Sequence, residues 1–592
     1  MAKRSSKSKS GPSTADRRVP DDAPTAQDPR LRRGCDIAAG LIAGVMFLIV
    51  LGLSTTHVIW PDDQYSDMNI LMSGETFATH GLLKLKLLPV FYIGAMTDPP
   101  SYYTHYPSLP AVIDGLWQMM GIRGVPAIRV LCGLLCIAGL ICMYLAFSPD
   151  IGALPAACGL GFVATTGYFF TYCISVHQHT YNIFFIGIFL LLFTRAVRSD
   201  RPDTRVWIGC WIALMLESLT SFEFIIYPQV FAWVYVLATG RIRRQWRLLI
   251  VLATAPIAGV GLHYLQNCWA LGWSAAWADA LDAFRRPGRG PAQDRWFILQ
   301  KVPEFVRLHS QRLYFWSWPV LPVVAAAWLA LSGRQRAGQA WLRRAGALLV
   351  GTVVASVSWY FFMPIHTVKH PHTMSQLLPL VMLVMGAGAA TIGRWLLNRD
   401  TPVHERILAV LAGVVLVFGQ TQSIGECFNR ASNQRPESFY LFEAMGENAF
   451  PPKSAVLTNT YADAQLAYFI RRPLWRSPTP LLPFDRESIT SLQERLPDDW
   501  RVSHYVFDTR GDHKAFQILA SNCPGQLVTI PGRRRPHALI IFDISSLFGP
   551  PGKPPALEPE VKRVQLQGKF PTWKSPGFME RLRDVLALHG KL

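Results

Sequence analysis

The chain has 592 residues, of which 50% are hydrophobic and only 16% are charged. This composition excludes an ordinary soluble globular protein, in which about 25% of the residues are charged. A formal net charge of +19 would suit a nucleic-acid-binding protein, but the basic residues lie in one tail and a few short loops, which excludes that class.

Residues 1–34 are polar, rich in Pro and Ser, and carry many lysines and arginines. They predict a disordered basic tail. The loops 195–205, 241–247 and 334–344 are also basic, which is the positive-inside pattern of membrane proteins. We therefore expect the tail and these loops on the cytoplasmic side. The first apolar segment begins too late and is too long for a cleaved signal peptide.

Residues 35–426 contain repeated apolar segments, each near the roughly 20 residues that a helix needs to cross a bilayer. They predict a polytopic α-helical membrane domain with about eleven spans, the N-terminus inside and the C-terminus outside. The expected spans are 36–56, 125–147, 153–172, 180–197, 205–221, 223–240, 246–266, 313–332, 345–364, 374–396 and 405–424.

This topology places two large loops, 57–124 and 267–312, on the outer side. Within the first loop, residues 107–121 are apolar but too short to cross the membrane, since they would reach only about 22 Å. They predict a helix that lies at the outer interface.

From residue 427 the composition changes to polar helices alternating with short β-rich runs. This pattern predicts that 427–592 is an extracytoplasmic α/β domain with a mainly parallel sheet. The expected strands are 454–458, 503–509, 527–530 and 537–544, and the expected helices are 436–448, 462–470, 485–495 and 512–521. Cys427 and Cys523 fall in this region, where an oxidising compartment would permit a disulfide.

The same topology gathers polar groups at the outer face. The acidic segment "WPDDQYSD" contains Asp62, Asp63, Tyr65 and Asp67. Carboxylates can accept a proton from a nucleophile, and cations can hold a departing phosphate. The other candidates lie in later loops and turns: His105, Tyr106, His177, His179, Glu217, Glu223, Lys369, His370 and His372.

Each candidate also has a purely structural interpretation. Asp62 and Asp63 follow a proline and suit the start of a helix, and Asp67 is either solvated or structural. Glu217 and Glu223 would then satisfy backbone groups in a broken helix. The tyrosines would form an interfacial aromatic belt, and the cations would snorkel to the interface.

One combination of features resembles a known family. The acidic pair after the first span is followed by the small pair in "SGETFATHG" and by "YPSLP" at the start of an interfacial helix. This order resembles the class C (GT-C) glycosyltransferases, and is most similar to the protein O-mannosyltransferase and lipid A aminoarabinose transferase group. The resemblance covers the order of elements across 35–426, and its local motif similarity is confined to 60–110 and, weakly, to 366–379.

The resemblance implies a polyprenyl-phosphate-linked sugar as donor and an active site in the first outer loop. Asp62 matches the catalytic carboxylate of the family, and Asp63 stands where its relatives carry Glu. His105 and Tyr106 lie near the donor-phosphate contact. Lys369, His370 and His372 are expected to assist there. Tyr65, Asp67, His177, His179, Glu217 and Glu223 are possible substrate-binding residues.

Several functions remain open at this stage. The leading expectation is an inverting hexosyl- or pentosyltransferase of a bacterial inner membrane, acting on a glycan, lipid or protein acceptor. The alternatives are a transporter or flippase, or a non-catalytic component of envelope polysaccharide synthesis. No cofactor is expected. A divalent metal at Asp62 and Asp63, as in oligosaccharyltransferase-like relatives, is not favoured, because no ligand spacing supports a metal site.

Overall fold

The computed structural model describes most of the membrane domain and the core of the C-terminal domain. The described ranges are 29–55, 64–91, 96–199, 203–285, 339–362, 371–398, 401–433, 445–460, 463–476, 492–508, 523–529 and 538–545, with the single positions 303, 324, 328, 442 and 519. Most of the predicted tail, the span 313–332 except for two positions, and the segment 549–592 lie outside these ranges.

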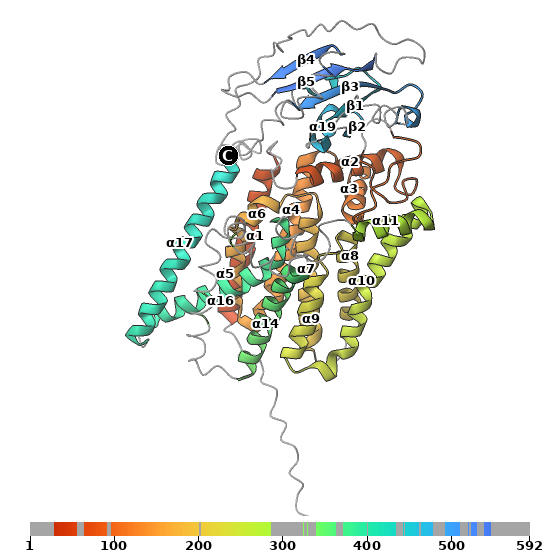
Figure 1. The fold of residues 1–592 in the computed structure, drawn as a ribbon. Helices are drawn as coiled ribbons and strands as arrows, with labels where there is room; N and C mark the ends of the chain where they lie inside the picture. Colours follow the sequence, from red (N-terminus) through yellow and green to blue (C-terminus); the bar gives the residue numbers. More distant parts are fainter. Residues whose placement is uncertain are drawn as a thin grey trace, which may run out of the picture.

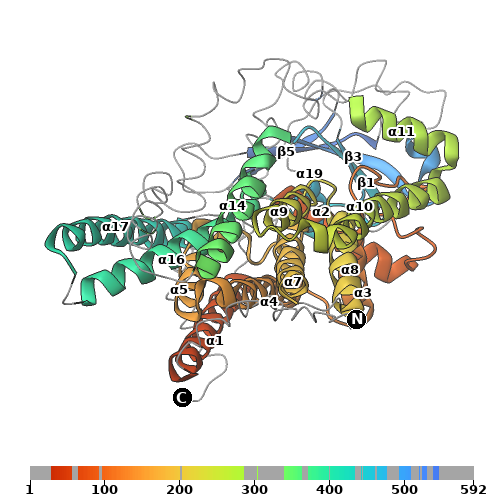
Figure 2. The same cartoon turned by 90° about the horizontal axis from the view of Figure 1, so that it is seen from below.

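Seven helices in this part of the chain are long and apolar enough to cross a bilayer. They are α1 (Pro29–Ser54), α4 (Val125–Ile151), α7 (Gln178–Arg198), α10 (Ile242–Leu271), α14 (Gln339–Phe362), α16 (Leu378–Leu397) with the preceding 3₁₀ helix η1 (Pro371–Leu377), and α17 (Val403–Asn433). Viewed along the bundle, α7 lies near the middle and α17 at one edge (Figure 2).

Three expected spans, 153–172, 205–221 and 223–240, form four shorter helices. These are α5 (Ala153–Ala164), α6 (Gly167–Tyr172), α8 (Thr204–Thr220) and α9 (Ile226–Ala238). The segment 153–172 is divided because Thr166 begins a new helix, and its hydroxyl accepts a hydrogen bond from the Phe169 amide at 3.1 Å. The expected count of about eleven spans is therefore not confirmed.

Glycines allow the closest pair of long helices, α4 and α7, to approach each other. A Cβ atom on Gly187 would lie 2.1 Å from the carbonyl oxygen of Gly139, and one on Gly139 would lie 2.4 Å from that of Ile183. Small residues that permit backbone contact are a usual means of packing helices in membranes.

Two helices lie between the long helices and the C-terminal sheet: α2 (Gln64–His80) and α3 (Leu109–Met119) (Figure 1). The predicted short helix within 107–121 is confirmed as α3. Another helix, α11 (Trp273–Arg285), lies near the same end of the bundle (Figure 1).

The C-terminal domain contains a five-stranded sheet with strand order β2-β1-β3-β5-β4. The strands are β1 (Ser454–Thr458), β2 (Leu474–Arg476), β3 (Arg501–Asp508), β4 (Gly525–Thr529) and β5 (Ala538–Asp543). β1 pairs in parallel with β2 and β3, whereas β5 pairs antiparallel with β3 and β4. The sheet is mixed, so the expectation of a mainly parallel sheet is wrong for half of its pairings.

Both faces of this sheet are covered. Tyr505 and Phe507 of β3 belong to one apolar cluster, while Val506 between them belongs to another, as strand alternation requires. The second cluster includes residues of the helix α19 (Asp463–Ile470). Ala449 of the short 3₁₀ helix η2 (Glu447–Ala449) packs against it. Cys523 lies in the first cluster and Cys427 in the core of the helical bundle, and the structure does not join these two cysteines by a disulfide.

The C-terminal domain is attached to α2 and to the loop before α3. The guanidinium of Arg471, directly after α19, binds both carboxylate oxygens of Glu75, with Nη1 to Oε2 at 2.8 Å. The Asp98 amide donates to the Arg495 carbonyl at 3.0 Å, and the Arg495 guanidinium donates to the Pro99 carbonyl at 3.2 Å. Apolar packing of α19 on α2 completes this contact.

The Glu75–Arg471 pair yields a first prediction. The side chains are 31% and 34% exposed, so we expect the two-point ion pair to contribute about 1 kcal/mol. Glu75→Arg and Arg471→Glu should each lower the thermal unfolding temperature of the detergent-solubilised protein, and the double exchange should recover part of the loss. Strictly additive effects of the two changes would show that the pair does not hold the domain in place.

Candidate functional site

The structure describes the surroundings of the acidic segment rather than its catalytic candidates. Asp62, Asp63, Lys369 and His370 lie outside the described residues. Tyr65 lies in the first turn of α2, and His372 is the second residue of η1.

Asp67 is the acidic residue whose role is clearest. Its Oδ1 atom accepts hydrogen bonds from the Ser175 hydroxyl at 2.8 Å and from the amides of Val176 and His177 at 3.0 Å each. The residue is only 8% exposed, which excludes the solvated interpretation. Asp67 therefore fixes α2 to the turn that precedes α7.

This contact places a carboxylate at the start of a membrane helix. His177 is the N-terminal cap residue of α7, and its own side chain makes no capping hydrogen bond. The first amides of a helix have no partner within the helix and attract anions. Asp67 supplies the missing acceptor from another helix, so the N-terminal end of α7 already holds a negative charge.

The two histidines of this turn lie in a buried aromatic row. The rings of His177 and His179 are 5.5 Å apart between centroids, and His179 packs edge-on against Tyr172 at 4.9 Å. His179 is fully buried. One turn later, the side-chain amide Nδ2 of Asn182 donates to the Ser375 hydroxyl at 2.6 Å, which joins α7 to η1. The predicted cationic segment thus continues into a helix that contacts the histidine-bearing helix.

His105 and Tyr106 both have acidic partners. The Tyr106 hydroxyl lies 3.3 Å from a carboxylate oxygen of Glu223, and His105 Nδ1 lies 3.7 Å from a carboxylate oxygen of Asp279 in α11. The structure therefore joins the loop before α3 to the α8–α9 turn and to α11. Two residues expected at a donor phosphate contact carboxylates here.

Glu217 is buried in the last turn of α8, with 1% of its surface exposed. Among the described residues, neither of its carboxylate oxygens has a hydrogen-bond partner. The predicted alternative, that Glu217 satisfies backbone groups of the broken helix, therefore finds no support in this part of the chain. A buried carboxylate without a partner is costly, which makes it a candidate contact for a polar ligand.

Asp114 of α3 is a residue that sequence reasoning missed. It is fully buried, and its Oδ2 atom accepts a hydrogen bond from the side-chain amide Nε2 of Gln118 at 2.9 Å. A Cβ atom on Gly74 would lie 1.9 Å from the same oxygen, so the glycine of the "SG" pair is required for α2 to pack on this acid. A lone acid within the apolar "PAVIDGLW" run was the available signal.

The environment of Asp114 changes its acidity. Burial raises the pKa of its carboxyl to about 7, the nearby Glu75 carboxylate also raises it, and the hydrogen bond from Gln118 opposes the change. This acid beneath α2 is therefore partly protonated near neutral pH.

Arg129, in the first turn of the span α4, was also missed. It is 2% exposed and interacts electrostatically with Asp67 of α2 and with Tyr468 of α19. The only signal in the sequence was a lone basic residue near the start of an apolar segment. Among the residues that the structure describes, no group of three or more His, Cys, Asp or Glu side chains gathers as a metal site would.

The Asp67 contact predicts a difference between two substitutions. Asp67→Asn keeps an oxygen that can accept the three hydrogen bonds. Asp67→Ala removes this acceptor from the Ser175 hydroxyl and the Val176 amide and leaves the His177 amide only its 3.3 Å bond to Ser175 Oγ, at about 1–3 kcal/mol. We expect Asp67→Ala to lower the unfolding temperature and to accelerate hydrogen exchange at the amides of Val176 and His177. Thr79→Ala, on the exposed side of α2, is the control. Equal effects of the Asn and Ala variants would contradict the role of Asp67 as a hydrogen-bond acceptor.

The raised pKa of Asp114 predicts how stability depends on pH. The folded protein keeps this proton up to about pH 7, whereas the unfolded chain releases it near the ordinary pKa of 3.8. The contribution of Asp114 to the free energy of unfolding therefore falls by roughly 4 kcal/mol as pH rises from about 4 to 7. Above that range the contribution is constant.

We expect Asp114→Asn to remove this part of the pH dependence, measured as the difference in unfolding temperature between pH 5 and pH 8. Asp498→Asn, at an exposed acid of the C-terminal domain, should leave that difference unchanged. An unchanged difference in Asp114→Asn would show that this carboxyl does not titrate in the range.

No family model and no curated protein matches the chain. Among solved structures, it is similar to ArnT from Cupriavidus metallidurans bound to undecaprenyl phosphate, with a TM-score of 0.49 and 15% identity over 87% of this chain and 99% of that one. The apo state of that ArnT matches with a TM-score of 0.48 and 16% identity, over 88% of this chain and 99% of that one. A third match is the archaeal oligosaccharyltransferase AglB from Archaeoglobus fulgidus in complex with an inhibitory peptide and a dolichol-phosphate. Its TM-score is 0.48, with 10% identity over 82% of this chain and 73% of that one.

Proposed function

We propose that the chain is an inverting glycosyltransferase that moves a monosaccharide from a polyprenyl phosphate to an acceptor on the extracytoplasmic side of the inner membrane. The observation that carries the proposal is the arrangement around α2. The acidic pair directly precedes Gln64, where α2 begins, and α2 is fixed to α7 by Asp67 and to the C-terminal domain by Glu75. The donor class follows from the sequence resemblance.

The contacts between distant segments support the proposal. The loop before α3 contacts the α8–α9 turn through Tyr106 and Glu223, and η1 contacts α7 through Ser375 and Asn182. Segments more than a hundred residues apart in sequence thus meet around one end of the bundle. A transferase that uses a membrane-bound donor and an acceptor outside the membrane needs such a polar site at the bilayer surface.

In the proposed reaction, an acceptor hydroxyl attacks the anomeric carbon of the donor sugar. The bond from that carbon to the phosphate oxygen breaks, polyprenyl phosphate leaves with the bonding electron pair, and the configuration at the carbon inverts. Asp62 takes the proton of the attacking hydroxyl. Asp63 supports Asp62, and both directly precede α2 in the sequence, a helix held by the Asp67 contact.

The departing phosphate is proposed to be bound by the cationic segment, which consists of Lys369, His370 and His372. His105 and Tyr106 remain part of the proposed donor contact. Their observed partners, Asp279 and Glu223, imply that the phosphate would have to compete with carboxylates for them. Glu217, His177 and His179 are proposed to contact the sugar.

The catalytic assignment is tested with Asp62→Asn in membranes that contain equal amounts of wild-type or variant protein. Loss of a general base should lower the rate of sugar transfer from a radiolabelled polyprenyl-phosphate hexose or pentose by about 100-fold or more. Asp499→Asn, an exposed acid paired with Lys453 in the C-terminal domain, is the matched control. Normal transfer by Asp62→Asn would remove the catalytic assignment. A wild-type protein that leaves every lipid-linked donor unused would favour transport or a non-catalytic role in assembly.

A further inference from the structure

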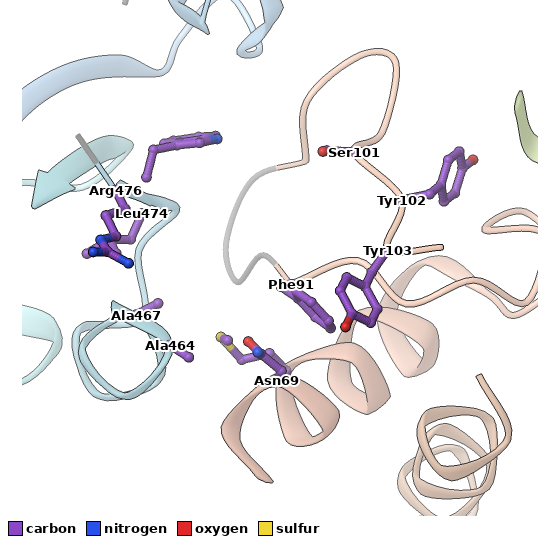
Figure 3. Close-up of a pocket in the computed structure, with 11 residues that line it drawn as sticks. Asn69, Phe91, Ser101, Tyr102, Tyr103, Ala464, Ala467, Leu474 and Arg476 are labelled. Carbon is purple, nitrogen blue, oxygen red and sulfur yellow. The ribbon is translucent and has the colours of Figure 1, made fainter. Parts of the chain in front are cut away.

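A cavity of about 250 Å³ separates α2 from the C-terminal domain. Its walls come from α2, from the loop before α3, and from α19 and β2 (Figure 3). A water molecule takes up roughly 30 Å³ in the liquid, so the cavity equals about eight waters. That space suits one sugar ring and is too small for a lipid chain.

The cavity exists because α19 presents small side chains to it. Ala464 and Ala467 are three positions apart, which places them on one face of the helix, and both line the cavity. Figure 3 shows them opposite Asn69 of α2. A larger residue at either position would fill the space.

Aromatic rings form the wall across from the C-terminal domain. Phe91 and Tyr103 lie with their ring centroids 4.7 Å apart, and Figure 3 shows both rings directed toward Asn69. Trp475 of β2 lines the other side. Flat aromatic faces suit the C–H face of a sugar ring, and the Tyr103 hydroxyl supplies a polar atom beside it.

Polar groups at the floor and the mouth add specificity. The carboxamide of Asn69 and the hydroxyl of Ser101 line the cavity and match sugar hydroxyls as donors and acceptors. Arg476, the exposed end of β2, lines the cavity as well. Its planar guanidinium is suited to a carboxylate or a phosphate.

We propose that this cavity binds one sugar residue of the acceptor, and that this sugar carries a carboxylate or a phosphate held by Arg476. The proposal rests on the proposed function, because it treats the bound sugar as part of the acceptor. Asn69 lies five residues after the start of α2, about 8 Å along the helix axis. A glycan seated here would therefore extend toward the end of α2 that joins the acidic pair.

The test uses the full chain in lipid nanodiscs and three probes: glucose, glucuronate and glucose 1-phosphate. Binding is measured by saturation-transfer NMR. We expect at least one charged probe to bind more tightly than glucose. Arg476→Gln should lower the affinity for that probe by about tenfold and leave the affinity for glucose unchanged. Ala467→Phe should abolish binding of all three probes. Arg501→Gln, at an exposed arginine of β3, is the charge control.

The two charged probes separate a sugar acid from a sugar phosphate as the source of the anion. Absence of binding by any probe, or equal binding of all three with no effect of Arg476→Gln, overturns the proposal. Asp62→Asn should bind the probes as the wild type does while losing transfer. If Asp62→Asn transfers sugar normally and Arg476-dependent binding persists, the proposed function fails and the binding site stands. If transfer depends on Asp62 but no probe binds, the cavity proposal fails alone.

Discussion

The position of α2 depends on one carboxylate oxygen. Oδ1 of Asp67 accepts three hydrogen bonds from the turn that begins α7, and α7 lies near the middle of the bundle (Figure 2). Because these partners are buried, the contact specifies where α2 crosses the end of the bundle. The contact with α3 and the contact with the C-terminal domain both depend on that position.

Around this contact, α2 uses each of its faces differently. Gly74 lies against Asp114 of α3, Glu75 pairs with Arg471 of the C-terminal domain, and Asn69 faces the cavity. A 17-residue helix therefore joins three layers of the molecule. The C-terminal domain is accordingly part of the site surroundings and not a separate appendage, since it supplies both an ion pair and one wall of the cavity.

Much of the fold could be predicted because long apolar segments and short β-rich runs are local signals. The helices α7 and α3 and the strand β1 lie close to their expected bounds. The direction of strand pairing was not predictable, because parallel and antiparallel strands show the same residue pattern over so few positions. The division of 153–172 by Thr166 was missed, since a capping threonine in an apolar run gives only a weak signal.

The contacts between segments were easier to predict than the contacts of single residues. The sequence indicated which loops meet, and the Tyr106–Glu223 contact joins two of them. The importance of Asp114 and Arg129 depends on burial between helices, which no local pattern reports. The Gly74 motif was noticed for its resemblance, whereas its physical reason, the space taken by the Asp114 carboxylate, required the packing of two helices to be known.

The cap on α7 also governs how negative charge can be neutralised at this end of the membrane domain. Many anion-binding proteins use the free amides of a helix end, which carry no net charge and are insensitive to pH. Here Asp67 already places a carboxylate at the start of α7, where it accepts from the amides of Val176 and of the N-cap residue His177. An anionic ligand near α7 would therefore need side-chain cations, and its binding would respond to ionic strength and to histidine protonation in a way that a backbone site would not.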